Sequence, residues 1–318
     1  MNWPVAPSLN CTAGSIAWAH GSDTLTHHAT GEGRSFQRDV LQFLVGKWVV
    51  LIGDSTARIM YHQLAALLSG KWTVWSGDGD TYNHFEAGSC FDLVCPWTTV
   101  VCPCLEEAFV GGARLTMVFS KFGVQDDLQL LTQLANRTVG VPNAVLVCIG
   151  TWWAMKDTWK AVGWSGSHTA QYQQALRGVA AATEAAFGYR RVQRVNGTVV
   201  AAPNYLREAW AVPPRYVLMG LPTCGSFNVP HNTAQRTNTL IQAAYRLVST
   251  ELNHSWAYFN RKMLTARVCP ADKSDCNFGY PHPVGATQNR ELQVLMQGLQ
   301  ALERPISRAM GHRRTHLH

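Results

Sequence analysis

The sequence Trp48-Val-Val-Leu-Ile-Gly-Asp-Ser55-Thr-Ala-Arg58 decides the fold. Its apolar start has strand length, and an amphipathic helix is predicted at 56–69, directly after the Gly-Asp-Ser turn. A serine in this place lies at a helix N-terminus, where backbone N–H groups and the positive end of the helix dipole face one point. Such a serine can attack a carbonyl carbon, and its own N–H can help to hold the oxyanion. The alternative is that Asp54 or Ser55 only caps the helix.

Strand-like and helix-like segments alternate outward from this stretch. The predicted strands are 47–52, 114–119, 144–149, 216–220 and 256–259, and the predicted helices are 56–69, 126–135, 168–187, 233–252 and 284–302. Because helix-length segments connect the strands, we expect a mostly parallel sheet with helices on both faces, a three-layer α/β fold. This domain should span 46–304, between an irregular N-terminal segment, 1–45, and a basic, disordered tail, 305–318.

Composition excludes several classes of function. The 318 residues are 47% hydrophobic and 15% charged, which argues against global disorder. Lys and Arg number 27 and Asp and Glu 20, a net charge of +7, but the charges are dispersed and form no basic stripe, so we expect no nucleic-acid partner. No apolar run is long enough to predict a transmembrane segment, and no glycine-rich nucleotide motif is present. The 12 tryptophans favour a carbohydrate ligand, although Trp is also a large core residue.

The cysteines and glycosylation motifs indicate an oxidising compartment. Nine cysteines are present; Cys148 lies in a predicted strand and should be a buried free thiol, while four others fall within 90–104. Such a cluster forms disulfides in a secreted protein and binds zinc in a cytosolic one, and its uneven spacing favours disulfides over a metal site. Asn-x-Ser/Thr motifs occur at Asn10, Asn136, Asn196 and Asn253. We therefore expect the secretory pathway lumen (Golgi) or the extracellular space, with the signal or anchor missing from this chain.

The motif Gly53-Asp54-Ser55-x-x-Arg58 resembles block I of the GDSL/SGNH hydrolases. Arg58, three residues after the serine, makes the motif similar to the PC-esterase branch, which includes the trichome-birefringence-like polysaccharide O-acetyltransferases and the sialic-acid O-acetyltransferase. Its other interpretation is a helix-surface arginine. The resemblance covers ordered landmarks from Lys47 to Leu302, and it implies a flavodoxin-like SGNH fold with Ser55 as nucleophile.

A second landmark follows the third predicted strand. Gly150-Thr-Trp152-Trp153 resembles the Asn-Thr-Gly-His-Trp-Trp segment of the trichome-birefringence-like enzymes, with Gly150 matching and Thr151 in place of His. The resemblance assigns Gly150, Trp152 and Trp153 to oxyanion or substrate binding, together with Gly53, Asp54 and Arg58 of the first motif. The paired tryptophans can equally fill a core.

The oxyanion hole departs from the family. Cys148 replaces the Asn whose side chain helps to hold the oxyanion in the wider superfamily, and a thiol is a weak donor. The N–H groups of Ser55 and Gly123 would therefore carry the role. Gly123, in Ser120-Lys-Phe-Gly123, occupies the family's block II position, and its alternative role is a simple turn.

The third landmark lies before the last predicted helix. The family keeps an Asp and a His together there, usually as Asp-x-x-His, and Asp275-Cys276 and His282-Pro-Val-Gly285 resemble this pattern. The spacing is seven residues here and three in the family, which a loop insertion of four residues would explain. The implied triad is Ser55, Asp275 and His282, with Asp272 as the alternative acid and an exposed loop histidine as the alternative for His282.

The resemblance implies a serine-dependent acyl-ester enzyme. Its reaction would be O-acetyl transfer or O-acetyl ester hydrolysis on a glycan through an acyl-serine, without a bound cofactor or metal. The acyl donor, acetyl-CoA or an acetylated glycan, would be a substrate. The missing Asn and the stretched Asp-to-His loop support an alternative, a catalytically inactive SGNH-like domain that binds carbohydrate or a protein partner.

Overall fold

The computed structural model describes residues 40–69, 90, 96, 98–138, 140–155, 158–188, 193–195, 198–200, 214–222, 231–253, 255–261 and 285–303. The structural statements below refer to these residues. Asp272, Asp275 and His282 lie outside them, as do most of the irregular segment and the tail expected at the two ends of the chain.

A six-stranded sheet forms the middle layer, with the strand order β2-β3-β1-β4-β7-β8. The strands are β1 (Trp48–Gly53), β2 (Cys104–Val110), β3 (Ala113–Phe119), β4 (Ala144–Cys148), β7 (Arg215–Met219) and β8 (Trp256–Phe259). All neighbours pair in parallel except β2 and β3, which form an antiparallel hairpin. Counted along the chain, the parallel strands have the order 2-1-3-4-5, which is the flavodoxin-like order. The expected fold class is therefore confirmed.

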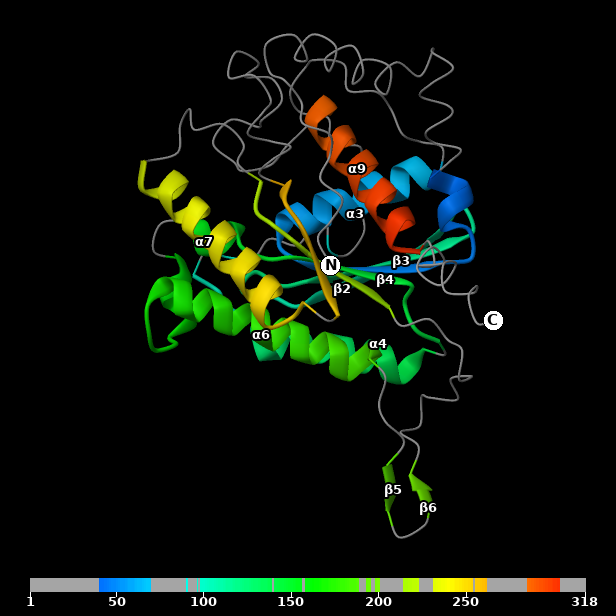
Figure 1. Cartoon of the computed structure of the whole chain (residues 1–318), viewed down its shortest axis with the longest axis horizontal. Coiled ribbons are helices and arrows are strands. Elements are labelled where there is room, and N and C mark those ends of the chain that lie inside the picture. Colours follow the sequence, from blue (N-terminus) through cyan, green and yellow to red (C-terminus); the bar gives the residue numbers. More distant parts are fainter. Residues whose placement is uncertain are drawn as a thin grey trace, which may run out of the picture.

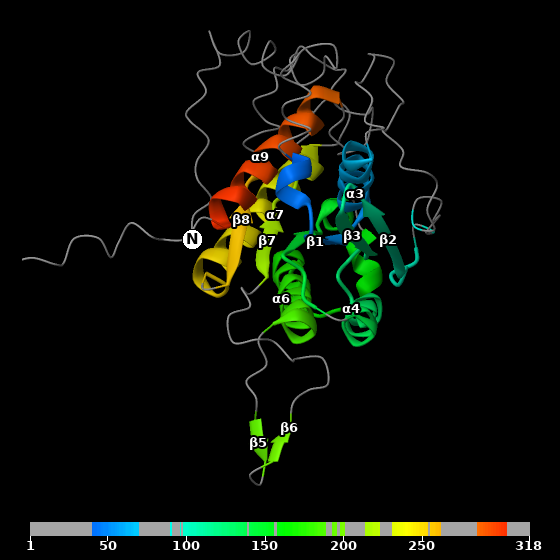
Figure 2. The same ribbon diagram turned by 90° about the vertical axis from the view of Figure 1, so that its right-hand side faces the viewer.

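Helices cover both faces of the sheet (Figures 1 and 2). They are α3 (Ser55–Leu68), α4 (Gln125–Arg137), α6 (His168–Phe187), α7 (His231–Thr250) and α9 (Gly285–Glu303). Helices α3 and α9 pack on one face, and α4, α6 and α7 on the other. Every predicted helix and parallel strand is present, with ends within two residues of the expectation.

The alternation of side chains along β1 shows why a near-continuous apolar run forms a central strand. Val50 and Ile52 belong to the core on the α4–α6–α7 face, whereas Val49 and Leu51 belong to the core on the α3–α9 face. Successive side chains point to opposite faces, so a strand covered on both sides must be apolar at every position.

Several elements were not expected from the sequence. The edge strand β2 lies in the region predicted to consist of turns, and only Ala108 of its seven residues is buried, so it lacks the apolar pattern of the other strands. A separate hairpin, β5 (Gln193–Val195) with β6 (Thr198–Val200), projects away from the main sheet (Figure 1). Two short helices, α5 (Thr151–Ala154) and the 3-10 helix η1 (Thr158–Val162), follow β4. Residues 40–44 are helical, and two of them are buried in the α3–α9 core, so the packed body begins before residue 46.

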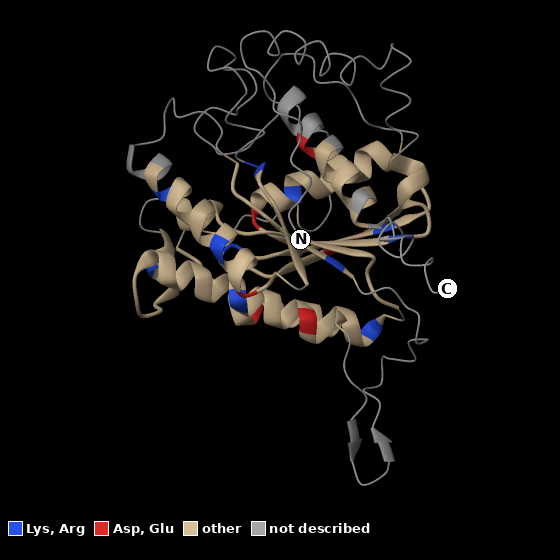
Figure 3. Cartoon of the chain, viewed as in Figure 1, with Lys and Arg blue, Asp and Glu red and all other residues tan. Residues whose placement is uncertain are grey.

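Within the described ranges, no helix is long and apolar enough to cross a membrane. Over the same part of the chain, basic and acidic side chains are scattered across the helices and strands and form no continuous stripe of one sign (Figure 3).

Candidate active site

The part of the predicted site that the structure describes, around Ser55, lies at the topological switch point of the sheet. Strands β1 and β4 are neighbours, and the chain leaves them toward opposite faces: β1 leads to α3, whereas β4 leads through α5 and η1 to α6. Open α/β sheets bind ligands beyond the carboxyl ends of their strands at such a point. The Gly53–Ser55 turn and the Gly150–Trp152 turn both begin there.

Gly53 is required by close packing at the end of β1. Its φ is +154°, and a Cβ on this residue would lie 1.9 Å from the carbonyl oxygen of Cys148. Hydrogen bonds hold the turn on both sides, because the Asp54 N–H donates to Cys148 O (3.1 Å) and the Ser120 N–H donates to Gly53 O (2.8 Å). Any larger residue would push β1 and β4 apart at this point.

Ser55 is the first residue of α3 and is partly exposed. The residue that caps the helix is Asp54, whose Oδ1 accepts from the Thr56 N–H at 2.9 Å. Of the two residues considered as the cap, the structure therefore selects Asp54, and the role of Ser55 as a nucleophile stays a prediction.

The Asp54 carboxylate braces the two turns of the switch point. Besides the cap, Oδ1 accepts from the Thr56 hydroxyl (2.8 Å), and Oδ2 accepts from the N–H groups of Gly150 (3.2 Å) and Thr151 (2.9 Å). The side chain is fully buried, and burial raises the pKa of this carboxyl, opposed by these four hydrogen bonds. Asp54 therefore orients the backbone around Ser55 and does not face solvent, unlike the substrate contact expected from the sequence.

Gly123 lies in the turn after β3, the other neighbour of β1, with φ of +69°. Its N–H donates to Ser120 Oγ at 3.0 Å, and Ser120 Oγ in turn donates to Asp127 Oδ2 at 2.6 Å. Asp127 is buried and also accepts from the Cys102 N–H at 2.9 Å. The Gly123 N–H can therefore act on an oxyanion only if it gives up or shares its bond to Ser120.

Trp152 and Trp153 differ in burial, and the two roles considered for them were substrate binding and core packing. Trp153 is completely buried in the α4–α6–α7 core, and its Nε1–H donates to Phe122 O at 3.2 Å. Trp152 is only partly buried, and Lys121 Nζ lies 4.4 Å from the centre of its ring. Trp153 is a core residue by position, and Trp152 is the one of the pair that reaches the surface near the switch point.

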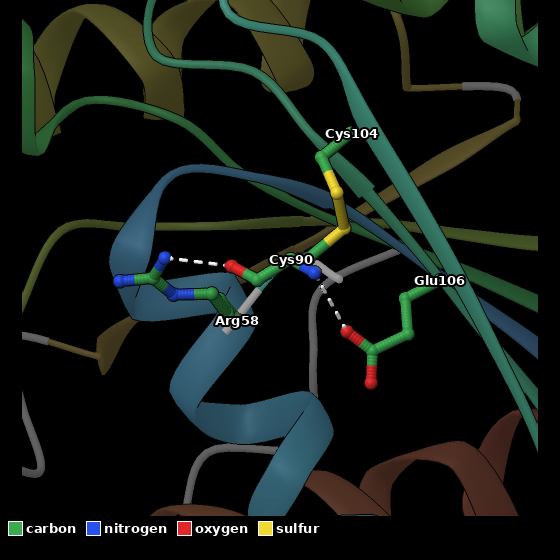
Figure 4. Close-up of a disulfide and its surroundings, with 4 residues drawn as sticks. All are labelled: Arg58, Cys90, Cys104 and Glu106. Carbon is green, nitrogen blue, oxygen red and sulfur yellow. Dashed lines mark hydrogen bonds between the residues drawn. A yellow bond between two sulfur atoms is a disulfide. The ribbon is translucent and has the colours of Figure 1, made fainter. Parts of the chain in front are cut away.

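Arg58 contacts the disulfide-bonded segment. Its Nη1 donates to the Cys90 carbonyl oxygen at 2.8 Å, and its guanidinium carbon lies 5.4 Å from the centre of the Phe119 ring. Cys90 forms a disulfide with Cys104, and its N–H donates to Glu106 Oε2 at 3.2 Å, as Figure 4 shows. Arg58 therefore joins α3 to the cysteine cluster, a contact that neither the substrate interpretation nor the surface interpretation anticipated.

The cysteine predictions are tested in part. Cys148 is a buried free thiol, as expected. Cys90 and Cys104 are paired, and Cys102 also belongs to a disulfide. In the described segments, no group of three or more His, Cys, Asp or Glu side chains could hold a metal ion.

Sequence reasoning missed the buried lysine next to the block II glycine. Lys121 Nζ donates to the carbonyl oxygens of Pro96 (2.6 Å) and Thr99 (3.0 Å), so it ties the cysteine-rich loop to the end of β3. Burial lowers the pKa of Lys121, and the nearby Asp127 acts in the opposite direction. The available signal was a lysine two residues after the predicted strand 114–119, at the end of the sheet where the site was expected.

Comparisons with known proteins add little to this geometry. No family model matches the chain, and no curated protein matches its sequence. Among solved structures, the chain is similar to a protein from Parabacteroides merdae ATCC 43184 provisionally described as a GDSL-like lipase. The two are 14% identical over 80% of this chain and 96% of that chain, with a TM-score of 0.41. At this level the similarity assigns no function, and the proposals below rest on the residues of the chain itself.

Proposed function

We propose that the chain is a serine-dependent acyl-ester enzyme in which Ser55 attacks an ester carbonyl. The observation that carries the proposal is the place of Ser55, partly exposed at the first position of α3 and at the switch point of the sheet. The capping bond to the Thr56 N–H is made by Asp54, so replacing Ser55 leaves this cap in place. The N-terminal end of a 14-residue helix also favours negative charge developing beside it.

The mechanism assigns the proton transfer to His282, oriented by Asp275. Ser55 Oγ forms a bond to the carbonyl carbon, its proton passes to the His282 ring, and the oxyanion accepts from the Ser55 N–H. The carbonyl reforms when the leaving group, an alcohol from an ester or a thiol from acetyl-CoA, departs with the proton from His282, which produces the acyl-serine. Water or an acceptor hydroxyl then attacks the acyl carbon and gives its proton to His282. The bond from the acyl carbon to Ser55 Oγ breaks, and Oγ takes the proton back from His282.

We assign an O-acetyl group on a glycan as the substrate, handled by transfer or by hydrolysis, with acetyl-CoA or an acetylated glycan as donor. The family resemblance of the motifs is one support. The other is aromatic: Trp152, Trp159 and Trp164 all lie on the segment that follows Gly150, and all three are only partly buried. Partly exposed indole rings provide the apolar faces on which sugars stack.

The test is covalent labelling of Ser55. Wild type should react with a fluorophosphonate probe at Ser55, identified by peptide mapping, and should release or transfer acetyl groups when given labelled donor and an oligosaccharide panel. Ser55→Ala should lose both activities and remain folded. Ser69→Ala is the matched control, because Ser69 is the C-cap at the opposite end of the same helix, α3, and its hydroxyl donates to Ala66 O at 3.0 Å. Wild-type turnover in Ser55→Ala would eliminate the assignment of the nucleophile.

A second candidate is a binding domain without catalysis. It is favoured by the internal hydrogen bonds of the Gly123 and Gly150 N–H groups, which leave fewer donors for an oxyanion. Saturable binding of an oligosaccharide by wild type and Ser55→Ala alike, with no labelling of either, would support this candidate.

We also propose an oxidising location, the secretory pathway lumen or the extracellular space. The Cys90–Cys104 disulfide supports it, because structural disulfides persist in such compartments.

A further inference from the structure

A chain of buried polar contacts connects the Ser55 turn to helix α9. The Thr56 hydroxyl donates to Asp54 Oδ1 at 2.8 Å and lies 2.9 Å from Cys148 Sγ. Cys148 Sγ also accepts from Arg261 Nη1 at 2.9 Å, and Arg261 pairs with Glu291 of α9. These groups come from four parts of the chain: the start of α3, the end of β4, the residues after β8, and α9.

In this series of contacts, the direction of each hydrogen bond can be assigned. Thr56 has one hydroxyl proton, which it gives to Asp54, so at the next contact the Cys148 thiol is the donor and Thr56 Oγ1 the acceptor. Burial raises the pKa of the Cys148 thiol to about 11, in keeping with a protonated sulfur that donates to Thr56 and accepts from Arg261.

The Arg261 guanidinium is held on all three of its nitrogens. Nε and Nη2 donate to the two carboxylate oxygens of Glu291 at 3.1 and 2.8 Å, and Nη1 donates to Cys148. The two side chains of the ion pair are 2% and 0% exposed. Because the guanidinium is planar and rigid, this arrangement sets the angle as well as the distance between α9 and the end of β4.

We propose that Arg261 and Glu291 are positioning residues, which hold the Ser55 turn in place against α9 through Cys148 and Thr56. The inference rests on the proposed function, since it assigns the pair a role in orienting the nucleophile. Neither residue touches the reacting atoms in this proposal. The pair acts through the placement of a helix.

The test replaces the ion pair by apolar side chains of similar volume, Arg261→Met with Glu291→Leu. Such replacements of buried ion pairs commonly preserve stability, so the variant keeps the packing but lacks the directional bonds. The maximal labelling rate of Ser55 by fluorophosphonate should fall at least about tenfold, because small misplacements of catalytic groups are costly, with little change in the probe concentration that gives half the maximal rate. Arg177→Met with Glu251→Leu is the control, because it removes an equally bidentate but exposed Arg–Glu pair, which joins the middle of α6 to the residue after α7.

Amide hydrogen exchange separates this inference from the proposed function. In the apolar variant, exchange should accelerate both in residues 53–57 and at the start of α9, and in the control at neither. Unchanged exchange, or accelerated exchange with wild-type labelling of Ser55, would overturn the positioning role. If wild type itself is not labelled, the proposed function fails, and the exchange result alone decides whether the two segments are coupled.

A milder variant covers the case in which the apolar pair does not fold. Arg261→Lys keeps the charge beside Glu291 but offers a single nitrogen in place of the three that now donate. The rate at which Ser55 is labelled in this variant should be clearly lower than in wild type, without falling to zero. A rate equal to wild type in this variant would equally remove the proposal.

Discussion

Asp54 holds the Ser55 turn with four hydrogen bonds from a single side chain. Its two oxygens accept from Thr56 on one side and from Gly150 and Thr151 on the other, so one buried carboxylate joins two turns that are about 96 residues apart in sequence. A conservative change at this position is a direct test of how firmly the turn is built.

We expect Asp54→Asn to lower the free energy of unfolding by about 1–3 kcal/mol, because an amide has only one acceptor oxygen and leaves buried donors without a partner. Urea denaturation followed by circular dichroism would measure the change. Asp126→Asn is the control, since Asp126 is exposed in the first turn of α4 and should change stability by less than about 0.5 kcal/mol. Equal effects of the two changes would contradict the conclusion that the Asp54 carboxylate stabilises the turns at Ser55 and Gly150.

His168 is a partly buried histidine that contacts Trp153 and Trp159, and its protonation should make the stability of the protein depend on pH. Its ring packs against that of Trp159 at an angle of 34°, with 4.7 Å between the ring centres, and its Nε2 lies 2.7 Å from Trp153 O. Burial lowers the pKa of His168 below its ordinary value of 6.5, which the hydrogen bond to Trp153 only partly opposes.

Because the pKa of His168 is lower in the folded state, the unfolded chain binds more protons below about pH 6.5. The stability contribution of the neutral ring is therefore complete above this pH and is lost as the pH falls from about 6.5 toward the pKa of the folded state. The unfolding free energy of wild type minus that of His168→Gln should decrease between pH 7.5 and 5.5. Taking the difference cancels the other histidines, and a difference that grows on acidification would reverse the sign of the pKa shift.

At the scale of elements, the edge strand β2 depends on cross-links more than on apolar burial. Cys104, its first residue, forms the disulfide with Cys90, and Glu106 and Arg58 hold the Cys90 backbone from β2 and α3. Helix α3, which begins at Ser55, thereby has a second attachment one turn below the nucleophile.

Removing the disulfide with Cys90→Ser and Cys104→Ser should lower the free energy of unfolding by about 3 kcal/mol. This is the stabilisation expected from closing a loop of this length, since the two cysteines are 14 residues apart. Arg58→Met should then cost less stability in the disulfide-free protein than in wild type, because its partner carbonyl is no longer held in place. A double-mutant cycle by urea denaturation measures both effects, and strictly additive losses would show that Arg58 and the disulfide act separately.

At the scale of the whole molecule, the order of strands brings the candidate site together. Strand β1 lies between β3 and β4, so the turns that contain Gly53–Ser55, Ser120–Gly123 and Gly150–Trp152 open on the same edge of the sheet. Helix α9, which begins at Gly285, packs on the same face of the sheet as α3, the helix that begins at Ser55. The Ser, Asp, His order of the proposed triad is compatible with this path of the chain.

The sequence by itself determined the alternation of strands and helices, the Gly-Asp-Ser turn at the end of β1 and the buried free thiol of Cys148, because periodicity and turn chemistry are local properties of the chain. It did not predict β2, whose pattern is weak at an exposed edge, and the Asp275–His282 assignment stays a prediction. Only the tertiary structure decided that Asp54 braces the Gly150 turn, that Trp153 fills the core while Trp152 reaches the surface, and that Arg261 joins Glu291 to Cys148. These partners lie tens of residues or more apart in sequence, and the choice among them depends on which buried polar groups the packed sheet and helices bring within hydrogen-bond distance.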